Sequence, residues 1–307
     1  MNRISSAMIP LASLGDLSRA QRELVEAARQ SSAQTKATDL KGYGREAQTL
    51  VSAERLVART QGFLVTAREL QTRMQIQDVA LGRAADVIAK LKEDLFQNVG
   101  LESGEGVRAQ LEEAFAVVKD TMNTNLGGRY LFGGVLNDRA PITAATLNDL
   151  ANNPLATSLP PAADSQLMRV EDGRTVRAGL VAEDVISGAL ASIKRLAEFD
   201  NGPSGPFDGP LTTAQKDAIT AELSALSSSF DQLLSAQAEN GRLLKEVDSA
   251  SKRQNSQLDA LNGAIGEIVN VDLAEVAVRL NQAQFAYEAS AGVFNVLRNM
   301  SLLNTLS

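Results

Sequence analysis

The stretch 273–307, LAEVAVRLNQAQFAYEASAGVFNVLRNMSLLNTLS, decides the fold that we expect. Its residues form a one-sided stripe in steps of three and four, as on an amphipathic helix. The stripe consists of Leu273, Val276, Leu280, Ala283, Tyr287, Ser290, Phe294 and Leu297. Residues 1–40 carry a weaker stripe that Pro10 and Gly15 interrupt. Such ends must cover their apolar sides against each other or against other copies, which favours assembly over a catalytic pocket.

Composition excludes several classes of protein. The formal net charge is −7 and the pI about 4.9, and no basic stripe interleaved with aromatics is present. We therefore expect neither nucleic-acid binding nor binding to an anionic membrane surface. The chain has no Cys and no His, which excludes disulfides, thiol catalysis and the commonest transition-metal ligand.

The start of the chain and its hydropathy bear on where the protein is found. No run of 18 apolar residues is present, so the sequence predicts no transmembrane helix. The first 20 residues lack the continuous apolar region of a cleavable signal peptide. The sequence thus predicts a cytoplasmic protein, or one exported without such a signal.

Long helices with aliphatic seams dominate the rest of the chain. Residues 45–98 keep one heptad register with Gln77 as its clear polar interruption, and residues 213–269 form a second such helix that Thr212 or Thr213 could cap. A helix over 107–126 should fold back antiparallel on the first, after a glycine-rich turn. A further helix is predicted over 183–199, and residues 270–272 break the chain before its last helix.

The middle of the chain reads differently. Gly127-Gly128-Arg129-Tyr130-Leu131-Phe132-Gly133-Gly134 has strand character between glycine pairs, and 141–166 reads as a loop with four prolines. Residues 167–178 predict a β-hairpin around Asp172-Gly173.

We therefore predict a mainly α fold: a long antiparallel helical bundle or coiled coil built from both termini, with a small β-containing insertion in the middle. Three parts are expected: a terminal helical domain of 1–40 with 271–307, a long-helix domain of 41–140 with 183–270, and an outward-facing hairpin and loop region of 141–182.

Searching for chemistry gives no catalytic, cofactor or metal site. Glu112 and Glu113 are adjacent on a helix and point about 100° apart, so a solvated face explains them better than a paired site. The glycine clusters lack the spacing of a phosphate loop, and no nucleophile motif is present.

The terminal stripes are instead the candidate interface. The last residues stay apolar to the end of the sequence, which argues for a partner surface. The predicted interface residues are Ile4, Leu11, Leu273, Val276, Leu280, Tyr287, Phe294, Leu297, Leu302 and Leu303.

Four segments resemble the bacterial flagellin family, and within it the hook–filament junction proteins, also called hook-associated protein 3. They are the start Met1-Asn2-Arg3-Ile4-Ser5, the block 128–134 with Pro141, the segment 271–290, and the ending Ser301-Leu302-Leu303-Asn304. The order and spacing of these segments carry the resemblance, which covers both terminal thirds.

The resemblance implies a structural, non-enzymatic role without cofactors, in the extracellular flagellum. It implies export by the flagellar type III apparatus without a cleaved signal peptide. The implied partners are further copies of the chain in a ring or helix, an adjacent hook-associated junction protein, flagellin and an export chaperone. Two alternatives stay open: a filament flagellin, and a secreted adhesin or glycan-binding protein that uses residues 128–210.

Overall fold

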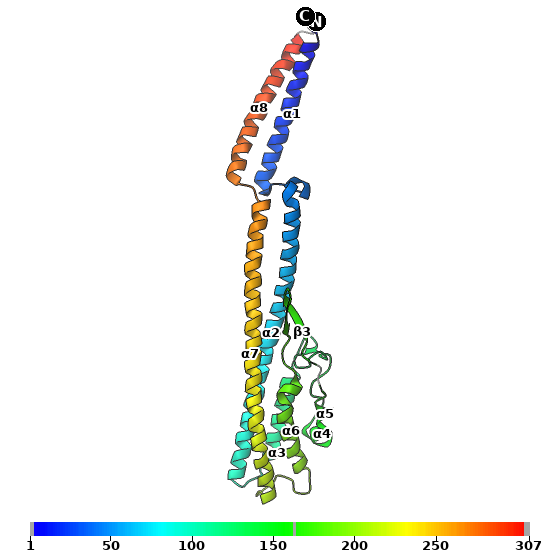
Figure 1. The fold of residues 1–307 in the computed structure, drawn as a ribbon, viewed down its shortest axis with the longest axis vertical. Coiled ribbons are helices and arrows are strands. Elements are labelled where there is room, and N and C mark those ends of the chain that lie inside the picture. The colour runs from blue at the N-terminus through cyan, green and yellow to red at the C-terminus, as the bar shows by residue number, and fades with distance from the viewer. Residues whose placement is uncertain (1–2, 162–163, 304–307) are drawn as a thin grey trace. The chain divides into compact units, whose positions relative to one another are not determined.

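The computed structural model describes residues 3–161 and 164–303, and within its first and last helices it describes side chains only from residue 12 and up to residue 298. Helices make up most of it, with two small antiparallel sheets (Figure 1), so the predicted mainly α fold is confirmed. Contacts divide the chain into two compact units, Met1–Arg59 with Gln257–Ser307 and Thr60–Ser256. The predicted three-part division remains a prediction.

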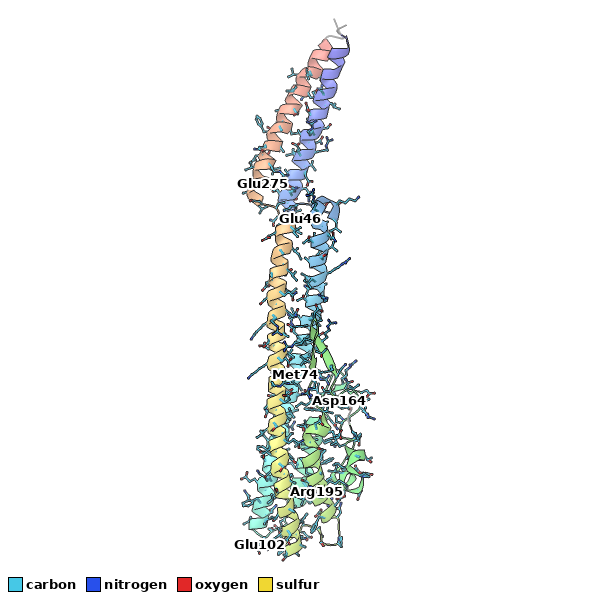
Figure 2. The ribbon with its side chains drawn as sticks, viewed as in Figure 1. Glu46, Met74, Glu102, Asp164, Arg195 and Glu275 are labelled. Atoms are coloured by element: carbon cyan, nitrogen blue, oxygen red, sulfur yellow. The ribbon has the colours of Figure 1, made fainter. Side chains whose placement is uncertain are left out.

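The unit of residues 60–256 is built around long helices. It contains α2 (Ala47–Gly100) from Thr60 onward, α3 (Val107–Met122), α6 (Ala182–Asp200) and α7 (Thr213–Val269) up to Ser256. Their facing sides form one large core in which many side chains are fully buried. Arg195, which is labelled in Figure 2, lies on α6. It donates two hydrogen bonds of 2.6 and 2.7 Å to Glu222 of α7.

The antiparallel return of α3 along α2 is confirmed. Lys90 pairs with Glu113 at 3.1 Å, and Asn98 donates a hydrogen bond of 2.8 Å to Gln110, so rising numbers on α2 match falling numbers on α3. The helix α3 ends earlier than predicted. Its end gives way to a short hairpin, β1 (Asn125–Leu126) with β2 (Arg129–Tyr130), whose turn places Gly127 and Gly128 at φ of 61° and 81°.

The predicted Tyr-Leu-Phe strand is only partly correct. Tyr130 ends β2, and the next two residues leave the strand to become core residues: Leu131 is 2% and Phe132 0% exposed. The loop predicted at 141–166 contains two short helices, α4 (Leu147–Asn152) and α5 (Leu155–Ser158). A capping box between Thr146 and Asp149 starts α4 and explains this difference.

Gln77, the polar interruption in the heptad pattern, holds neighbouring segments of the chain on α2 by hydrogen bonds to their backbone carbonyls. Its side-chain amide is fully buried and donates to the carbonyls of Leu131 (2.8 Å) and Leu180 (3.3 Å). Arg73, one turn earlier, donates to the Leu131 carbonyl at 3.2 Å, and burial lowers the pKa of its guanidinium. Asn240 of α7 donates to the Met74 carbonyl at 2.8 Å. These bonds fix both the loop and α7 on α2.

The hairpin predicted at 167–178 is confirmed. Strand β3 (Leu167–Glu171) pairs with β4 (Arg174–Arg177), and Gly173 supplies the positive φ of 72° that the turn needs. Its underside, Val170 and Val176, is buried against apolar side chains of α2 and α7. The predicted helix after it is α6, and the Thr212 hydroxyl accepts a bond from the Gln215 amide at 3.3 Å at the start of α7.

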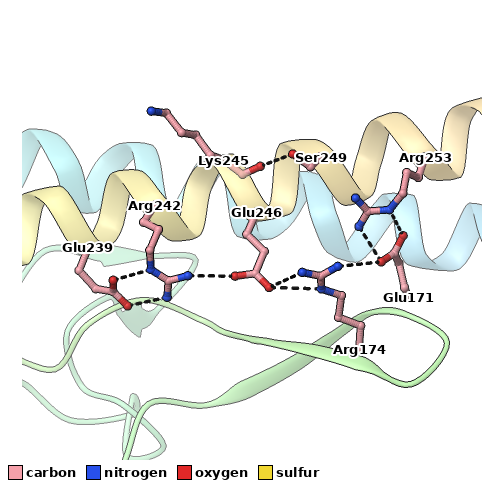
Figure 3. A network of polar contacts seen from close by, with 8 residues as sticks. All are labelled: Glu171, Arg174, Glu239, Arg242, Lys245, Glu246, Ser249 and Arg253. Atoms are coloured by element: carbon pink, nitrogen blue, oxygen red, sulfur yellow. Dashed lines mark hydrogen bonds and ion pairs between the residues drawn. The ribbon is translucent and has the colours of Figure 1, made fainter.

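Ion pairs fasten the rim of this hairpin to α7 (Figure 3). Glu171 accepts two hydrogen bonds of 2.8 and 2.7 Å from Arg253, and Arg174 donates two of 3.3 and 3.2 Å to Glu246. The hydrogen bonds from Arg253 hold the pKa of the Glu171 carboxyl below its usual value. The pairs are partly exposed, so each contributes modestly.

In the unit of residues 1–59 and 257–307, α1 (Arg3–Ala33) and α8 (Leu273–Leu303) lie side by side (Figure 1). The predicted interruption at Pro10 and Gly15 is wrong, because α1 runs through both positions. A short 3-10 helix, η1 (Leu40–Glu46), follows, with Asp39 accepting from the Gly42 amide at its start. No helix in the described residues is long and apolar enough to cross a membrane.

We expect Gly179→Ala to destabilise the unit of residues 60–256. Gly179 has φ of 115°, and a Cβ there would collide with the side-chain amide of Gln77. The free energy of unfolding should fall by about 1–3 kcal/mol, measured by urea denaturation. The control is Gly62→Ala, the same change within α2 with no atom within 4 Å of the new Cβ, which should add about 0.5–1 kcal/mol. Equal effects of the two changes would contradict this role of Gly179.

We expect Glu171→Gln to lower the free energy of unfolding by about 1 kcal/mol at pH 7. Because the folded-state pKa of Glu171 lies below 4.5, its contribution is present above that pH and is lost as the pH falls further. The difference between variant and wild type in urea denaturation should therefore shrink toward pH 3. The control is Asp248→Asn, which breaks the exposed Lys252–Asp248 pair on α7, the helix that carries Arg253. This change should alter the free energy of unfolding little. A difference that stayed constant from pH 7 to pH 3 would refute the stabilising role of the ionised Glu171 carboxylate.

Candidate assembly surface

The paired terminal helices are held together at one end by a clasp between their connecting segments. Thr35 and Asn270 form an antiparallel bridge. The Lys36 amide donates to the Val269 carbonyl at 2.8 Å, and the Val271 amide donates to the Gln34 carbonyl at 3.2 Å. The Asp272 carboxylate then accepts from the Ala274 amide at 2.8 Å and so caps α8. Both chain segments therefore enter the helix pair in a fixed register.

The seam between α1 and α8 is thin. The buried side chains along it, among those that the structure describes, are Ala20, Ala27, Gln30, Val276 and Ala283. Arg279 donates to the Gln30 side chain at 3.1 Å and sets the antiparallel register. Alanines let two helices approach closely but bury little apolar area, so this seam contributes little free energy by itself.

The predicted interface residues do not share one environment. Val276 is buried in the seam, and Leu280, Tyr287, Phe294 and Leu297 are half-buried on the same helix face. Leu273, at the first turn of α8, is 49% exposed. The side chains of Ile4, Leu11, Leu302 and Leu303 lie outside the described part of the structure. The stripe found in the sequence therefore mainly faces α1, and its part in an interface between copies remains a prediction.

A second apolar row on α8 was missed. Val278, Phe285, Val293 and Val296 are 55%, 75%, 55% and 59% exposed, and we call them the α8 outer row. Val278 lies two residues beyond Val276 and thus about 200° around the helix. On α1, Leu14 and Val25 are likewise 49% and 62% exposed. Testing both faces of the terminal helix for apolar spacing, rather than the stronger one alone, would have found the outer row.

An open groove runs beside the seam on one side of the pair. Its residues include Ala27, Ala283 and Ala286, and charged side chains of both signs flank them: Arg22, Glu23, Glu26 and Arg279. We call it the α1–α8 groove. Nothing in it resembles a catalytic or metal-binding arrangement, and no group of three or more His, Cys, Asp or Glu side chains among the described residues could hold a metal ion.

Comparison with known proteins gives a likeness in structure but none in sequence. No protein-family model and no curated protein matches the chain. A solved structure from Vibrio parahaemolyticus, provisionally assigned as a flagellar hook-associated protein, matches with a TM-score of 0.61 over 73% of this chain and 97% of that one. The chain shares its fold with that hook-associated protein.

The identity between the two sequences is 15%, so this likeness concerns the fold. The structure of FlgL from Bacillus cereus also matches, with a TM-score of 0.41 and 14% identity over 63% of this chain and 98% of that one. At the level of fold, the resemblance to hook-associated proteins predicted from the sequence is confirmed.

We expect Val276→Asp and Phe285→Asp to differ in the isolated chain. A carboxylate at buried Val276 has no partner and should cost about 3 kcal/mol or more, which opens the α1–α8 pair. A carboxylate at Phe285 stays in water and should leave the pair closed. Hydrogen–deuterium exchange of the α1 and α8 amides measures the difference. Similar exchange in the two variants would contradict the assignment of the two faces.

Proposed function

We propose that this protein is a structural subunit of the bacterial flagellum that joins hook to filament and assembles through its N- and C-terminal helices. The observation that carries the proposal is the two-sided apolar character of α8. One face lies in the seam with α1, while the outer row on the opposite face is largely exposed. A helix that is apolar all round is stable when other elements surround it.

The free energy gained by burying the outer row supports assembly. Full burial of a Val or Phe side chain contributes about 1.5–3 kcal/mol. The four outer-row side chains are each more than half exposed, so covering them would contribute roughly 4–7 kcal/mol before the costs of association. Within the seam, by comparison, the buried apolar side chains are small, and Leu280, Tyr287, Phe294 and Leu297 are only half-buried.

The fold shared with a hook-associated protein is the second support, and it favours the flagellum over other assemblies. We extend the proposal to the partners that such a place requires: other copies of this chain, an adjacent hook-associated junction protein, flagellin and an export chaperone. The location would then be extracellular, after export without a cleaved signal peptide, and the role mechanical rather than catalytic.

The test is incorporation into flagella. We expect Phe285→Asp to abolish incorporation, because a carboxylate in the covered outer row would be buried without a partner. Leu280→Asp and Phe294→Asp should do the same by opening the α1–α8 pair. Asn295→Asp, which adds the same charge to an exposed polar position of α8 outside the outer row, is the matched control and should incorporate. Immunogold labelling of isolated flagella measures the outcome, and incorporation of Phe285→Asp at the control level would refute the proposal.

The same labelling separates the two flagellar roles. A junction subunit should be labelled as one band at the hook end of the filament. A filament flagellin should be labelled along the whole filament, and the purified chain should polymerise onto filament seeds without limit. Absence of label from flagella would remove both roles and leave the adhesin alternative.

A further inference from the structure

The α8 outer row and the α1–α8 groove lie on different faces of the same helix pair. Phe285 stands in the outer row, and Ala286 of the groove is the next residue, about 100° around α8. Phe285 is the most exposed of the large apolar side chains described on α8, at 75%. One face thus presents an aromatic side chain that projects, and the other presents a recess lined by three alanines and by charged and polar side chains.

Both features stand at the same height along the helix pair. The hydrogen bond from Arg279 to Gln30 fixes the register of two antiparallel helices with equal rise per residue. Phe285 is six residues further along α8 than Arg279. It therefore lies at the height of residue 24 of α1 (30 − 6), although its side chain points away from α1. The groove extends over residues 22–27 and 279–286, so that height falls inside it. Copies placed side by side at equal height would bring Phe285 of one to the groove of the next.

Arg22 and Glu288 carry opposite charges near this height. The groove is also lined by Glu23, Glu26 and Arg279, with Glu26 paired to Arg29 at 2.6 Å. Arg22, at the groove, forms no ion pair with any residue that the structure describes. Glu288 lies one turn beyond Phe285, and its carboxylate is reached by the Gln284 side-chain amide at 3.3 Å but by no cation among the described residues. By the same register, Arg22 lies opposite residue 287 (279 + 8), next to Glu288.

We propose that Phe285 of one copy of this chain inserts into the α1–α8 groove of a second copy, with Glu288 of the first facing Arg22 of the second. We assign a second copy as the occupant because this chain carries both halves of the contact at the same height. The inserting half is Phe285 with Glu288, and the receiving half is the groove with Arg22. The contact joins two different surfaces, so each copy can both offer and receive it. Such a heterologous contact builds a ring or a helix. This inference rests on the proposed function, since it specifies how copies meet in the assembly.

The absence of cysteine makes the contact testable by cross-linking. A chain carrying both Arg22→Cys and Glu288→Cys keeps Phe285 and the alanines. It is expressed in place of the wild type, isolated with the flagella and treated with a short thiol cross-linker; the purified chain at high concentration is treated in parallel. We expect covalent species of two and more chain masses from the double variant, and none from either single variant. The matched control pairs Glu288→Cys with Gln21→Cys, an exposed α1 position about 100° away from Arg22, and should give none.

Multimers from Glu288→Cys alone would mean that identical faces meet, and equal yield from the Gln21→Cys control would mean nonspecific proximity; either overturns the proposal. Cross-links to a protein of another mass in place of a copy also overturn it, as does the absence of multimers in both samples. Incorporation without cross-links refutes this contact and leaves the flagellar role standing. Multimers in the purified chain with none of the chain in flagella support the contact and refute the flagellar role.

A charge exchange tests the same contact without cysteines. Arg22→Glu and Glu288→Arg should each reduce incorporation, because each places like charges opposite one another. The two changes together should restore it. If the double exchange is as defective as the worse single variant, Arg22 and Glu288 do not meet.

Discussion

A helix that is apolar on two opposite faces needs more than one partner, and α8 is such a helix. Its seam with α1 covers Val276 and Ala283, and the outer row of Val278, Phe285, Val293 and Val296 stays largely in water. The buried seam residues Ala27 and Ala283 also line the α1–α8 groove, so this side of the pair presents a recess rather than a filled surface. Under the proposed function, further chains cover both the outer row and this recess.

The two compact units differ in what stabilises them. The unit of residues 60–256 has a core of fully buried large side chains, such as Leu81, Ile88 and Phe132. Its buried Gln77, Arg73 and Asn240 donate hydrogen bonds to backbone carbonyls, while Gln77 Oε1, Arg73 Nε and Asn240 Oδ1 have no hydrogen-bond partner among the described residues. The terminal unit relies on alanines, a backbone clasp at Thr35 and Asn270, and few large buried side chains among those described. Burial of large apolar side chains, and with it the free energy of folding, is therefore concentrated in residues 60–256.

Sequence periodicity predicted the long helices and the antiparallel return of α3 because each follows from local spacing and turn chemistry. The Asp172-Gly173 hairpin was predictable for the same reason, since a positive φ at Gly173 is a local requirement. Pro10 and Gly15 were overrated as breaks, since one missing hydrogen bond or one flexible residue does not end a helix that runs to Ala33. The carbonyl partners of Gln77 could not be predicted from local sequence patterns, because they lie 54 and 103 residues away in the chain.

The candidate interface shows why a stripe does not reveal its own partner. Heptad spacing identified Leu280, Tyr287 and Phe294 as one face of α8, but spacing alone cannot say whether that face meets the same chain or another one. The structure places that face with the buried seam residues, so the surface left for neighbours is the weaker row, whose members are spaced more widely along the helix. In a chain whose ends pair first, the strongest apolar stripe is used within the molecule. If copies meet as proposed, the exposed row determines how, and a single aromatic such as Phe285 carries more of its area than any one of the valines around it.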